Sequence, residues 1–532
     1  MQIDKGGKLK KVRGNYCESP TSFDIRRSKE RGGRREVKIA NKERRDEFAA
    51  GSGFRQWRPG AKKGWRVRER CWVEWSSDRM GRGSCLRQEL LATMVEDKTV
   101  AVGFSTIAEF SVNPLSVHQI DINNLHGHLD EEIFMTAPEG YDIAPGHACL
   151  LRRLLYGSKQ ASRQWNVEFT RSLEGLGFKQ SGHDHCLFFK PLDTGFIGLL
   201  VYVDDVLIMA PSLASISQDL GCARYFLGLQ IGRSKEGMSI TQSKYILDLV
   251  SECGLQDGKS AATPLPPGIK FNSNSGNLFE DPEWYRRLVG CLLYLSFTRP
   301  DISHGVQQLS WFLQRPCHSH WQAALHLVCY LKGCSEVGLF FPSSNSLQLQ
   351  AFCDADCGAC ADTRWPLTGY AIFLGPALIS WKTKKQCIVS RSSTEVEYRS
   401  MATTACELQW ISYLLRDFGV TVSTPIPFHC DNQAALHIMA NPVFHERTKH
   451  LDIDCHVVRD LYKFGFLLPV IVRSKEQVAD LFTKPLSSLA FLPLLCKLGL
   501  FAFAPRRLEL DNVACSMCSE KIQSSTLKTK AL

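Results

Sequence analysis

The stretch Gly198-Leu-Leu-Val-Tyr-Val-Asp-Asp-Val-Leu-Ile-Met209 sets two adjacent aspartates between two apolar runs. Short apolar runs rich in β-branched and aromatic residues are typical of buried strands. The sequence therefore predicts a hairpin whose turn presents Asp204 and Asp205. An isolated pair of aspartates in a turn is ordinary turn chemistry. The apolar strand on each side favours a functional origin for this pair.

A third aspartate, Asp121, ends another predicted strand, Val117-His-Gln-Ile-Asp121. Phosphoryl transfer with two divalent cations requires carboxylates from different strand ends to converge. Cations of the magnesium type prefer oxygen ligands. Asp121, Asp204 and Asp205 supply such ligands, so we predict a metal-dependent site for phosphoryl transfer there.

A second set of acids lies in the C-terminal half of the chain. Residues 347–354 alternate as a strand does, residues 393–415 have a helical pattern, and residues 426–431 form a further strand pattern. The candidate acids on these elements and at the start of the final helix are Asp354, Glu397, Asp431 and Asp480. Asp356 and Glu395 are neighbouring alternatives, and a solvated surface charge is the ordinary role for each. Four acids from four elements can hold two metals against a scissile phosphate.

The first acid set carries a resemblance to a known family. Tyr202-Val-Asp-Asp205 resembles the YxDD signature of reverse transcriptases, and residues 118–135 resemble the first palm motif of copia-type retrotransposons. Leu155-Tyr-Gly-Ser-Lys-Gln-Ala-Ser-Arg-Gln-Trp165 resembles their next motif, which lies beneath the template and the incoming nucleotide. The resemblance implies RNA-directed DNA synthesis from an RNA template, a DNA primer and deoxynucleotides. The nucleic-acid contacts that it implies come from Tyr202, Lys159, Gln160 and Arg163.

The second acid set resembles the four acids of ribonuclease H. This resemblance implies cleavage of the RNA strand of an RNA/DNA hybrid. Asp354, Glu397, Asp431 and Asp480 would then be both catalytic residues and metal ligands. Two Mg²⁺ or Mn²⁺ ions are implied for each of the two active sites. Asp354 and Glu397 are preferred to Asp356 and Glu395 because they match the family pattern.

The positive charge of the chain is concentrated near its N-terminus. The 532 residues carry a net charge of +10. Residues 1–97 hold 25 Lys and Arg against 14 Asp and Glu, a net of +11, and the remainder holds 39 against 40. A basic segment attracts nucleic acid by neutralising phosphates, and a solvated tail without a specific partner is the alternative. Because the segment lacks clear periodicity, we predict that it is largely disordered.

Composition also bounds the cellular setting. The 21 cysteines are scattered, and Met1 is followed by polar and charged residues. We therefore expect free thiols, no signal peptide and an intracellular location, cytoplasmic or nuclear. The apolar run at 196–203 ends at Asp204, far short of about 20 residues, so no transmembrane helix or membrane partner is expected.

Three features depart from the copia pattern. No fingers region precedes the first palm motif, and the passage from Asp219 to Tyr225 is abrupt. The usual Asn-Asn-Ala-Phe-Leu-His-Gly reads Asn123-Asn-Leu-His-Gly127, without the Phe that would stack under the sugar. Small misplacements can cost phosphoryl transfer about 100-fold. We therefore expect DNA synthesis to be impaired and hybrid cleavage to survive. The alternative is a catalytically dead remnant that at most binds nucleic acid.

These observations predict a mixed α/β (α+β) chain of five parts. A truncated reverse transcriptase palm and thumb precede a ribonuclease H-like domain with a mixed five-stranded sheet and helices. The predicted parts are a leader at 1–97, a palm at 98–255, thumb or connection helices at 256–344, the ribonuclease H-like domain at 345–490 and a tail at 491–532.

Overall fold

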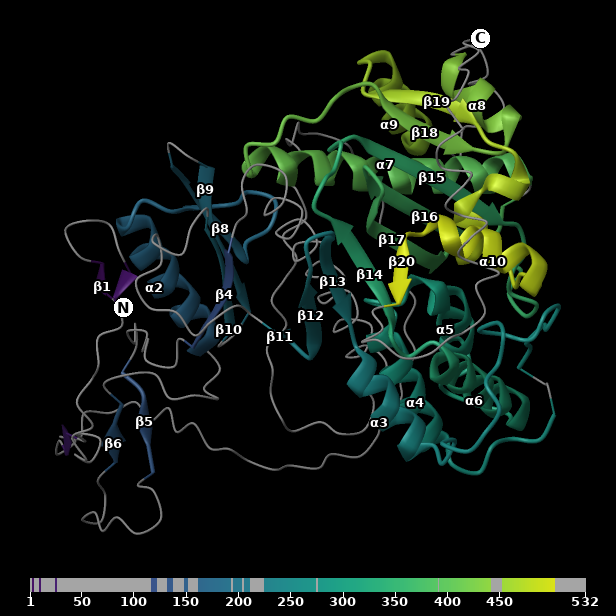
Figure 1. Ribbon diagram of the computed structural model, residues 1–532, viewed down its shortest axis with the longest axis horizontal. Helices are drawn as coiled ribbons and strands as arrows, with labels where there is room; N and C mark the ends of the chain where they lie inside the picture. Colours follow the sequence, from purple (N-terminus) through teal and green to yellow (C-terminus); the bar gives the residue numbers. More distant parts are fainter. Residues whose placement is uncertain are drawn as a thin grey trace, which may run out of the picture. The chain divides into compact units, whose positions relative to one another are not determined.

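The structure is a computed structural model of the chain (Figure 1). It describes residues 132–136, 148–151, 161–192, 195–202, 205–210, 224–273, 276–390, 392–441 and 452–502, and the backbone of four earlier strands. Those strands are Gln2–Ile3 (β1), Leu9–Lys10 (β2), Asp24–Ile25 (β3) and Ser116–Asp121 (β4). Apart from β1 to β3, the leader predicted to be disordered lies outside the described residues.

The chain divides into two compact units. Residues 14–80 and 124–172 form the smaller unit, and residues 1–13, 81–123 and 173–532 form the larger one. The smaller unit holds a three-stranded antiparallel sheet in the order β3, Cys149–Leu150 (β6), Phe134–Met135 (β5). Helix Ala161–Gly175 (α2) begins in this unit and ends in the larger one.

An antiparallel sheet of five strands carries the first acid set. Its order is β4, Asp205–Ala210 (β10), Gly195–Tyr202 (β9), Leu187–Leu192 (β8) and Lys179–Gln180 (β7). Tyr202 pairs with Asp205, so residues 203 and 204 join β9 to β10. The predicted hairpin forms, with Leu200 and Leu207 opposite each other and both buried. The expectation that Asp205 lies in the turn is wrong, because Asp205 is the first residue of β10 and pairs with Tyr202.

A second five-stranded sheet draws its strands from distant parts of the chain. Its order is Tyr225–Phe226 (β11), Leu229–Arg233 (β12), Gly237–Thr241 (β13), Val337–Pro342 (β14) and Leu500–Ala502 (β20). The helices between β13 and β14 are Ser243–Glu252 (α3), Pro282–Leu295 (α4), Ser303–Ser310 (α5) and His318–Gly333 (α6). Strands β14 and β20 are neighbours in this sheet, although the whole of the third sheet, described next, lies between them in the sequence (Figure 1).

The third sheet is the mixed five-stranded sheet that the sequence predicts. Its order is Ala377–Lys385 (β17), Leu367–Leu374 (β16), Leu349–Asp356 (β15), Ile426–Cys430 (β18) and Leu467–Ile471 (β19). The first three strands are antiparallel, and β18 and β19 continue the sheet in parallel. All eight residues of β16 are buried, which fits an internal strand of the sheet that is covered on both faces.

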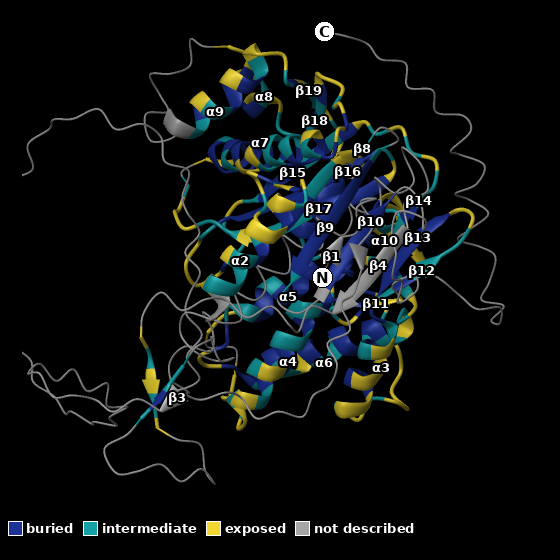
Figure 2. Ribbon diagram, turned by 90° about the vertical axis from the view of Figure 1, so that its left-hand side faces the viewer, coloured by how far each residue is buried: buried dark blue, intermediate teal, exposed yellow. Residues whose placement is uncertain are grey.

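Helices and short 3₁₀ turns complete this third block. They are Ser393–Asp417 (α7), Gln433–Ala440 (α8), Asp452–Lys463 (α9), Ser474–Glu476 (η5), Val478–Phe482 (η6) and Ser488–Lys497 (α10). Helix α7 lies along β15 and β16, and Figure 2 shows buried strands beneath partly exposed helices. The mixed α/β class is therefore confirmed. Among the described residues, no helix is both long and apolar enough to cross a membrane.

Candidate active site

Asp354 lies near the end of β15, the central strand of the mixed sheet, and is 1% exposed. Its Oδ2 accepts a hydrogen bond from Thr483 Oγ1. Its Oδ1 lies 3.2 Å from Nζ of Lys484. A buried carboxylate is costly unless it is paired and hydrogen-bonded. Both oxygens of Asp354 have such partners, so the strand presents a carboxylate in a fixed position.

Helix α7 carries Glu397 against the same strand. Ser400 Oγ donates a hydrogen bond of 2.8 Å to the backbone oxygen of Asp354, which ties the helix to β15. Glu397 is 6% exposed, and its Oε2 has no hydrogen-bond partner in the described part of the chain. Burial, and then the neighbouring Asp354, raise the pKa of Glu397 to about 10. The carboxyl group is therefore held where its charged form is unfavourable.

Asp431 directly follows β18, which runs parallel to β15. Parallel strands end at the same edge of a sheet, so Asp431 reaches the neighbourhood of Asp354. Ser474 Oγ donates to Asp431 Oδ2 at 3.2 Å. Burial raises the pKa of Asp431, and Asp354 adds to the shift. The prediction that a strand ends at this acid is confirmed.

Asp480 lies in η6, which packs on the sheet beside β15 and β16. Gln477 Nε2 donates to the backbone oxygen of Cys353 at 2.9 Å. Gly369 in β16 permits this close packing, because a Cβ there would lie 2.6 Å from Thr483 Cγ2. Asp480 Oδ1 is 2.6 Å from Lys484 Nζ. Burial first, and then Asp354, raise the pKa of Asp480 to about 7.

The expectation that Asp480 opens the final helix is wrong. The acid lies inside the short helix η6, and α10 begins later, at Ser488. Pro485 separates the two helices. Proline has no backbone N–H, and it disfavours helical backbone in the residue before it, which favours a break between the two helices at this position.

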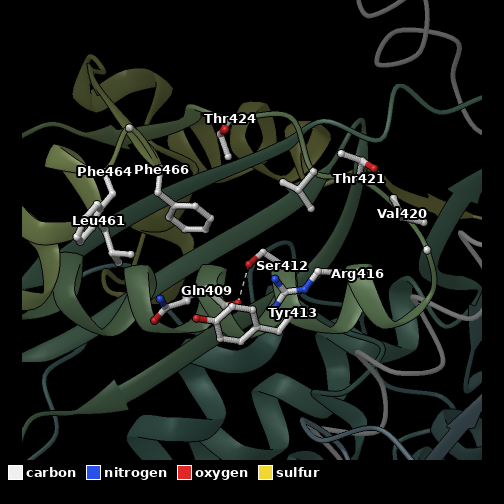
Figure 3. Close-up of a pocket in the computed structure, with 13 residues that line it drawn as sticks. Gln409, Ser412, Tyr413, Arg416, Val420, Thr421, Thr424, Leu461, Phe464 and Phe466 are labelled. Atoms are coloured by element: carbon white, nitrogen blue, oxygen red, sulfur yellow. Dashed lines mark hydrogen bonds between the residues drawn. The ribbon is translucent and has the colours of Figure 1, made fainter. Parts of the chain in front are cut away.

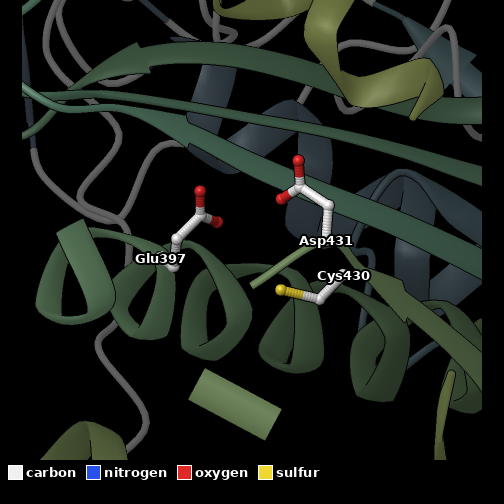
Figure 4. A group of neighbouring side chains, drawn as sticks. All are labelled: Glu397, Cys430 and Asp431. Carbon is white, nitrogen blue, oxygen red and sulfur yellow. The ribbon is translucent and has the colours of Figure 1, made fainter. Parts of the chain in front are cut away.

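The four acids thus come together from four elements. One carboxylate oxygen from each of Asp354, Asp431 and Asp480 lies within 4.8 Å of the other two. Glu397, Cys430 and Asp431 form a second such group (Figure 4). The donors of the first group are all oxygen, which suits Mg²⁺ or Mn²⁺. A divalent cation would favour the charged carboxylates of Asp431 and Asp480, whose pKa is raised first by burial and then by the neighbouring Asp354, so the residues fit the metal that the resemblance implies.

The neighbouring acids have different surroundings. Glu395 accepts a hydrogen bond from Arg399 Nη2 at 3.0 Å, so a cation on its own helix already neutralises it. Asp356 is half-buried and belongs to neither of the two groups of clustered donors. These contacts support the choice of Glu397 and Asp354 over both alternatives.

Lys484 and Thr483 are site residues that the sequence reading missed. Lys484 bridges Asp354 and Asp480, and Thr483 donates to Asp354. The four-residue spacing between Asp480 and Lys484 is the signal that could have found the lysine, since such residues are neighbours on a helical turn. Its second contact, to Asp354, joins residues 130 apart and has no local signal.

The first acid set is described only in part. Asp121 ends β4 and Asp205 begins β10, and the two are directly paired across the sheet. Tyr202 ends β9 opposite Asp205 and is half-buried, while Arg163 is exposed on α2. Asp204, Lys159 and Gln160 lie outside the described residues. The backbone therefore brings Asp121 and Asp205 together, as the resemblance implies.

A cavity of about 580 Å³ lies at the C-terminal end of α7. Tyr413, Arg416, Leu461, Phe464 and Phe466 are among the residues that line it (Figure 3). None of the predicted acids lines this cavity. The chemistry of the carboxylate cluster therefore does not depend on it.

Comparison with known proteins identifies the family. A family described as reverse transcriptase (RNA-dependent DNA polymerase) matches residues 104–267. The retrovirus-related Pol polyprotein from transposon RE2 of Arabidopsis thaliana is 40% identical over 405 residues, which are 73% of this chain and 28% of the relative. The corresponding polyprotein from transposon TNT 1-94 of Nicotiana tabacum is 33% identical over 70% of this chain and 30% of the relative.

A shorter relative is matched over almost its whole length. The putative transposon Ty5-1 protein of Saccharomyces cerevisiae is 32% identical over 307 residues, which are 54% of this chain and 99% of the relative. By contrast, the chain spans less than a third of the two plant polyproteins. The paired strands of the YxDD hairpin lie within the matched reverse transcriptase region. The chain therefore belongs to the reverse transcriptase family of copia-type retrotransposon Pol polyproteins.

Proposed function

We propose that the chain cleaves the RNA strand of an RNA/DNA hybrid by two-metal phosphoryl transfer at Asp354, Glu397, Asp431 and Asp480. The observation that carries this proposal is the convergence of carboxylate oxygens from β15, β18 and η6 to within 4.8 Å. Glu397 joins them from α7. Such convergence is what two bound cations require to clamp the attacking and leaving oxygens.

Bound Mg²⁺ or Mn²⁺ would activate water and stabilise the leaving oxygen. The residues of the chain supply position and charge. Thr483 fixes one oxygen of Asp354, and Ser474 fixes one oxygen of Asp431. Glu397 Oε2 has no protein partner among the described residues, so it can serve as a ligand without first breaking a hydrogen bond. Fixed donors reduce the reorganisation needed during reaction.

The electrostatics support the same assignment. The pKa is raised at Glu397, Asp431 and Asp480, with burial as the largest cause and the other acids adding to it. Perturbed acids that converge from separate elements are typical of functional sites. A purely structural cluster would be expected to have a fixed cation for each acid, whereas here Asp354 and Asp480 share one lysine, Lys484.

The test is cleavage of an end-labelled RNA strand annealed to DNA by the purified full chain, with Mg²⁺ or Mn²⁺. We expect metal-dependent products from the hybrid and none from the same RNA alone. A chain that is folded by circular dichroism but leaves the hybrid intact with either metal would overturn the proposal. If that chain still binds the hybrid, the alternative of a dead, nucleic-acid-binding remnant is favoured.

A second proposed activity is RNA-directed DNA synthesis at Asp121, Asp204 and Asp205. The direct pairing of Asp121 with Asp205 supports it, as does membership of the family. An RNA template, a DNA primer and deoxynucleotides would be the partners, contacted by Tyr202, Lys159, Gln160 and Arg163. We expect this activity to be impaired, because the first palm motif lacks the phenylalanine that would stack under the sugar. Robust full-length primer extension with magnesium would contradict that expectation.

A further inference from the structure

Cys430 belongs to a donor set that differs in chemistry from the acids alone. Its Sγ, one oxygen of Glu397 and one oxygen of Asp431 all lie within 4.8 Å of one another. Figure 4 shows the two carboxylates turned towards each other, with the sulfur below them in that view. A thiolate is a soft ligand that suits Zn²⁺, whereas Mg²⁺ prefers oxygen. One side of the carboxylate cluster therefore offers a mixed sulfur and oxygen environment.

Glu397 gives an independent reason to expect a ligand there. The residue is 6% exposed, and its Oε2 is buried without a hydrogen-bond partner among the described residues. Leaving a buried polar atom without a partner is unfavourable, because its hydration is lost and not replaced. A cation at this position would remove the cost.

Cys430 is held in place rather than free to turn away. It is the last residue of β18 and is 0% exposed. The backbone N–H of Asn432 donates to its sulfur at 3.4 Å. Asp431, the next residue, is half-buried and connects the group to solvent. The three donors therefore combine two buried side chains with one that a cation can reach.

We propose that Glu397, Cys430 and Asp431 form a binding site for a thiophilic divalent cation of the Zn²⁺ type. Zinc–sulfur bonds of about 2.3 Å and zinc–oxygen bonds of about 2.0–2.2 Å in a tetrahedron require donors about 3.5 Å apart. Because the present donors lie within 4.8 Å of one another, each pair would have to approach by at most about 1.3 Å. On binding, the Cys430 thiol and the neutral Glu397 carboxyl each release a proton to solvent, and the sulfur and a carboxylate oxygen form bonds to the metal.

This site shares Glu397 and Asp431 with the proposed Mg²⁺ ligands. Occupation by the thiophilic cation would therefore remove two carboxylates from magnesium coordination and inhibit hybrid cleavage. The inhibition rests on the proposed function, whereas the binding itself does not. The binding test must accordingly be separate from the activity test.

The probe is Cd²⁺ added to the full chain under reducing conditions, followed by the ultraviolet charge-transfer absorption of cadmium bound to thiolate. We expect a tight, saturable component that excess Mg²⁺ displaces. Cys430→Ser should abolish that component. Cys387→Ser, which removes an exposed cysteine of the same block, is the matched control and should leave it unchanged.

Glu397→Gln keeps the thiol and provides a second test if Cys430→Ser does not fold. It should weaken the tight component by at least about tenfold, because one charged ligand is lost. An unchanged tight component in folded Cys430→Ser, or in Glu397→Gln, would overturn the site. Tight Cd²⁺ binding by a chain that cleaves no hybrid with Mg²⁺ would overturn the proposed function alone. Cleavage without the Cys430-dependent component would overturn the inference alone.

Discussion

Asp301 and Glu397 are both buried carboxylates, but their surroundings are opposite. Asp301, in the 3₁₀ helix Pro300–Ile302 (η2), accepts hydrogen bonds from Arg299 Nε at 3.0 Å and Nη2 at 2.7 Å. Tyr330 adds a third at 2.6 Å. Glu397 has other acids nearby, and its Oε2 has no partner among the described residues. Both side chains are almost inaccessible, so burial does not distinguish them.

The difference lies in whether the protein itself neutralises the charge. A buried carboxylate with a complete set of donors is satisfied, and adding a ligand would cost hydrogen bonds. A buried carboxylate with a raised pKa and an open oxygen is stabilised by a cation from solution. We therefore interpret Arg299 and Asp301 as a structural pair, and the four acids of the mixed sheet as a ligand site.

The strongest test of this contrast is Asp354→Asn. Loss of one metal-coordinating charge should remove about 4 kcal/mol of transition-state stabilisation, or roughly a thousandfold in the rate of hybrid cleavage. Asp356→Asn is the matched control, because that acid lies two residues away on the same strand and outside both donor groups. Single-turnover cleavage rates measure both variants. Equal losses from the two substitutions would contradict the assignment of Asp354.

The structural pair predicts a large effect on stability. Asp301→Asn should lower the free energy of unfolding by about 3 kcal/mol, because it leaves the guanidinium of Arg299 buried without a counter-charge. Denaturant unfolding monitored by circular dichroism measures this loss. Replacing both residues, as Arg299→Met with Asp301→Leu, should recover much of it, since no uncompensated charge then remains. A double variant as unstable as the single one would show that the ion pair itself supplies the stability.

Glu397 should make the metal-free protein less stable as pH rises. Its pKa is raised from 4.5 to about 10, so the neutral carboxyl is favoured in the folded state. The contribution to stability is complete below pH 4.5 and is lost as pH rises towards 10. Asp480 behaves similarly between 3.8 and about 7. Asp354, Cys430 and Asp431 face Glu397, and each of them raises its pKa further beyond the effect of burial.

Glu397→Gln isolates this effect. From pH 7 to about pH 8.5, it should flatten the decline in stability, whose slope for one group is at most about 1.4 kcal/mol per pH unit. Urea unfolding in the presence of a chelator measures the slope. Two results would argue against a raised pKa of Glu397 in the folded state: a wild-type stability that rises with pH over this range, or a Glu397→Gln variant with the wild-type slope.

Much of the ligand site could be predicted from the sequence because its acids lie at or near the ends of local patterns. Asp354 lies near the end of β15, Asp431 directly follows β18, and Glu397 lies near the start of α7. The pairing of β14 with β20 could not be predicted, because it depends on contacts between residues about 160 apart, such as Leu339 with Leu500. Short-range periodicity contains no information about such distant partners.

The sequence also could not show which buried acid has a cation beside it. Arg299 and Asp301 are two residues apart, yet their burial depends on α6, which contributes Tyr330. No sequence motif marks Cys430 as a ligand, and its proposed role follows only from the proximity of Glu397, which lies on another element. Sequence therefore indicated where acids occur, whereas the charge that surrounds each acid is a property of the assembled fold.

The smallest expected effect concerns Lys484, a protein cation that pairs with two acids of the proposed metal site. Its ammonium contacts Asp354 and Asp480, but its side chain is 36% exposed. Lys484→Met should cost the metal-free protein about 1 kcal/mol, since solvent screening discounts an exposed ion pair. The same variant should gain more stability from Mg²⁺ than the wild type, because no ammonium competes for the carboxylates. Thermal unfolding with Mg²⁺ and with a chelator measures both effects, and Lys475→Met, which removes an exposed lysine, should change neither. If Lys484→Met instead abolished the stabilisation by Mg²⁺, the lysine would be helping to assemble the metal site rather than substituting for the metal.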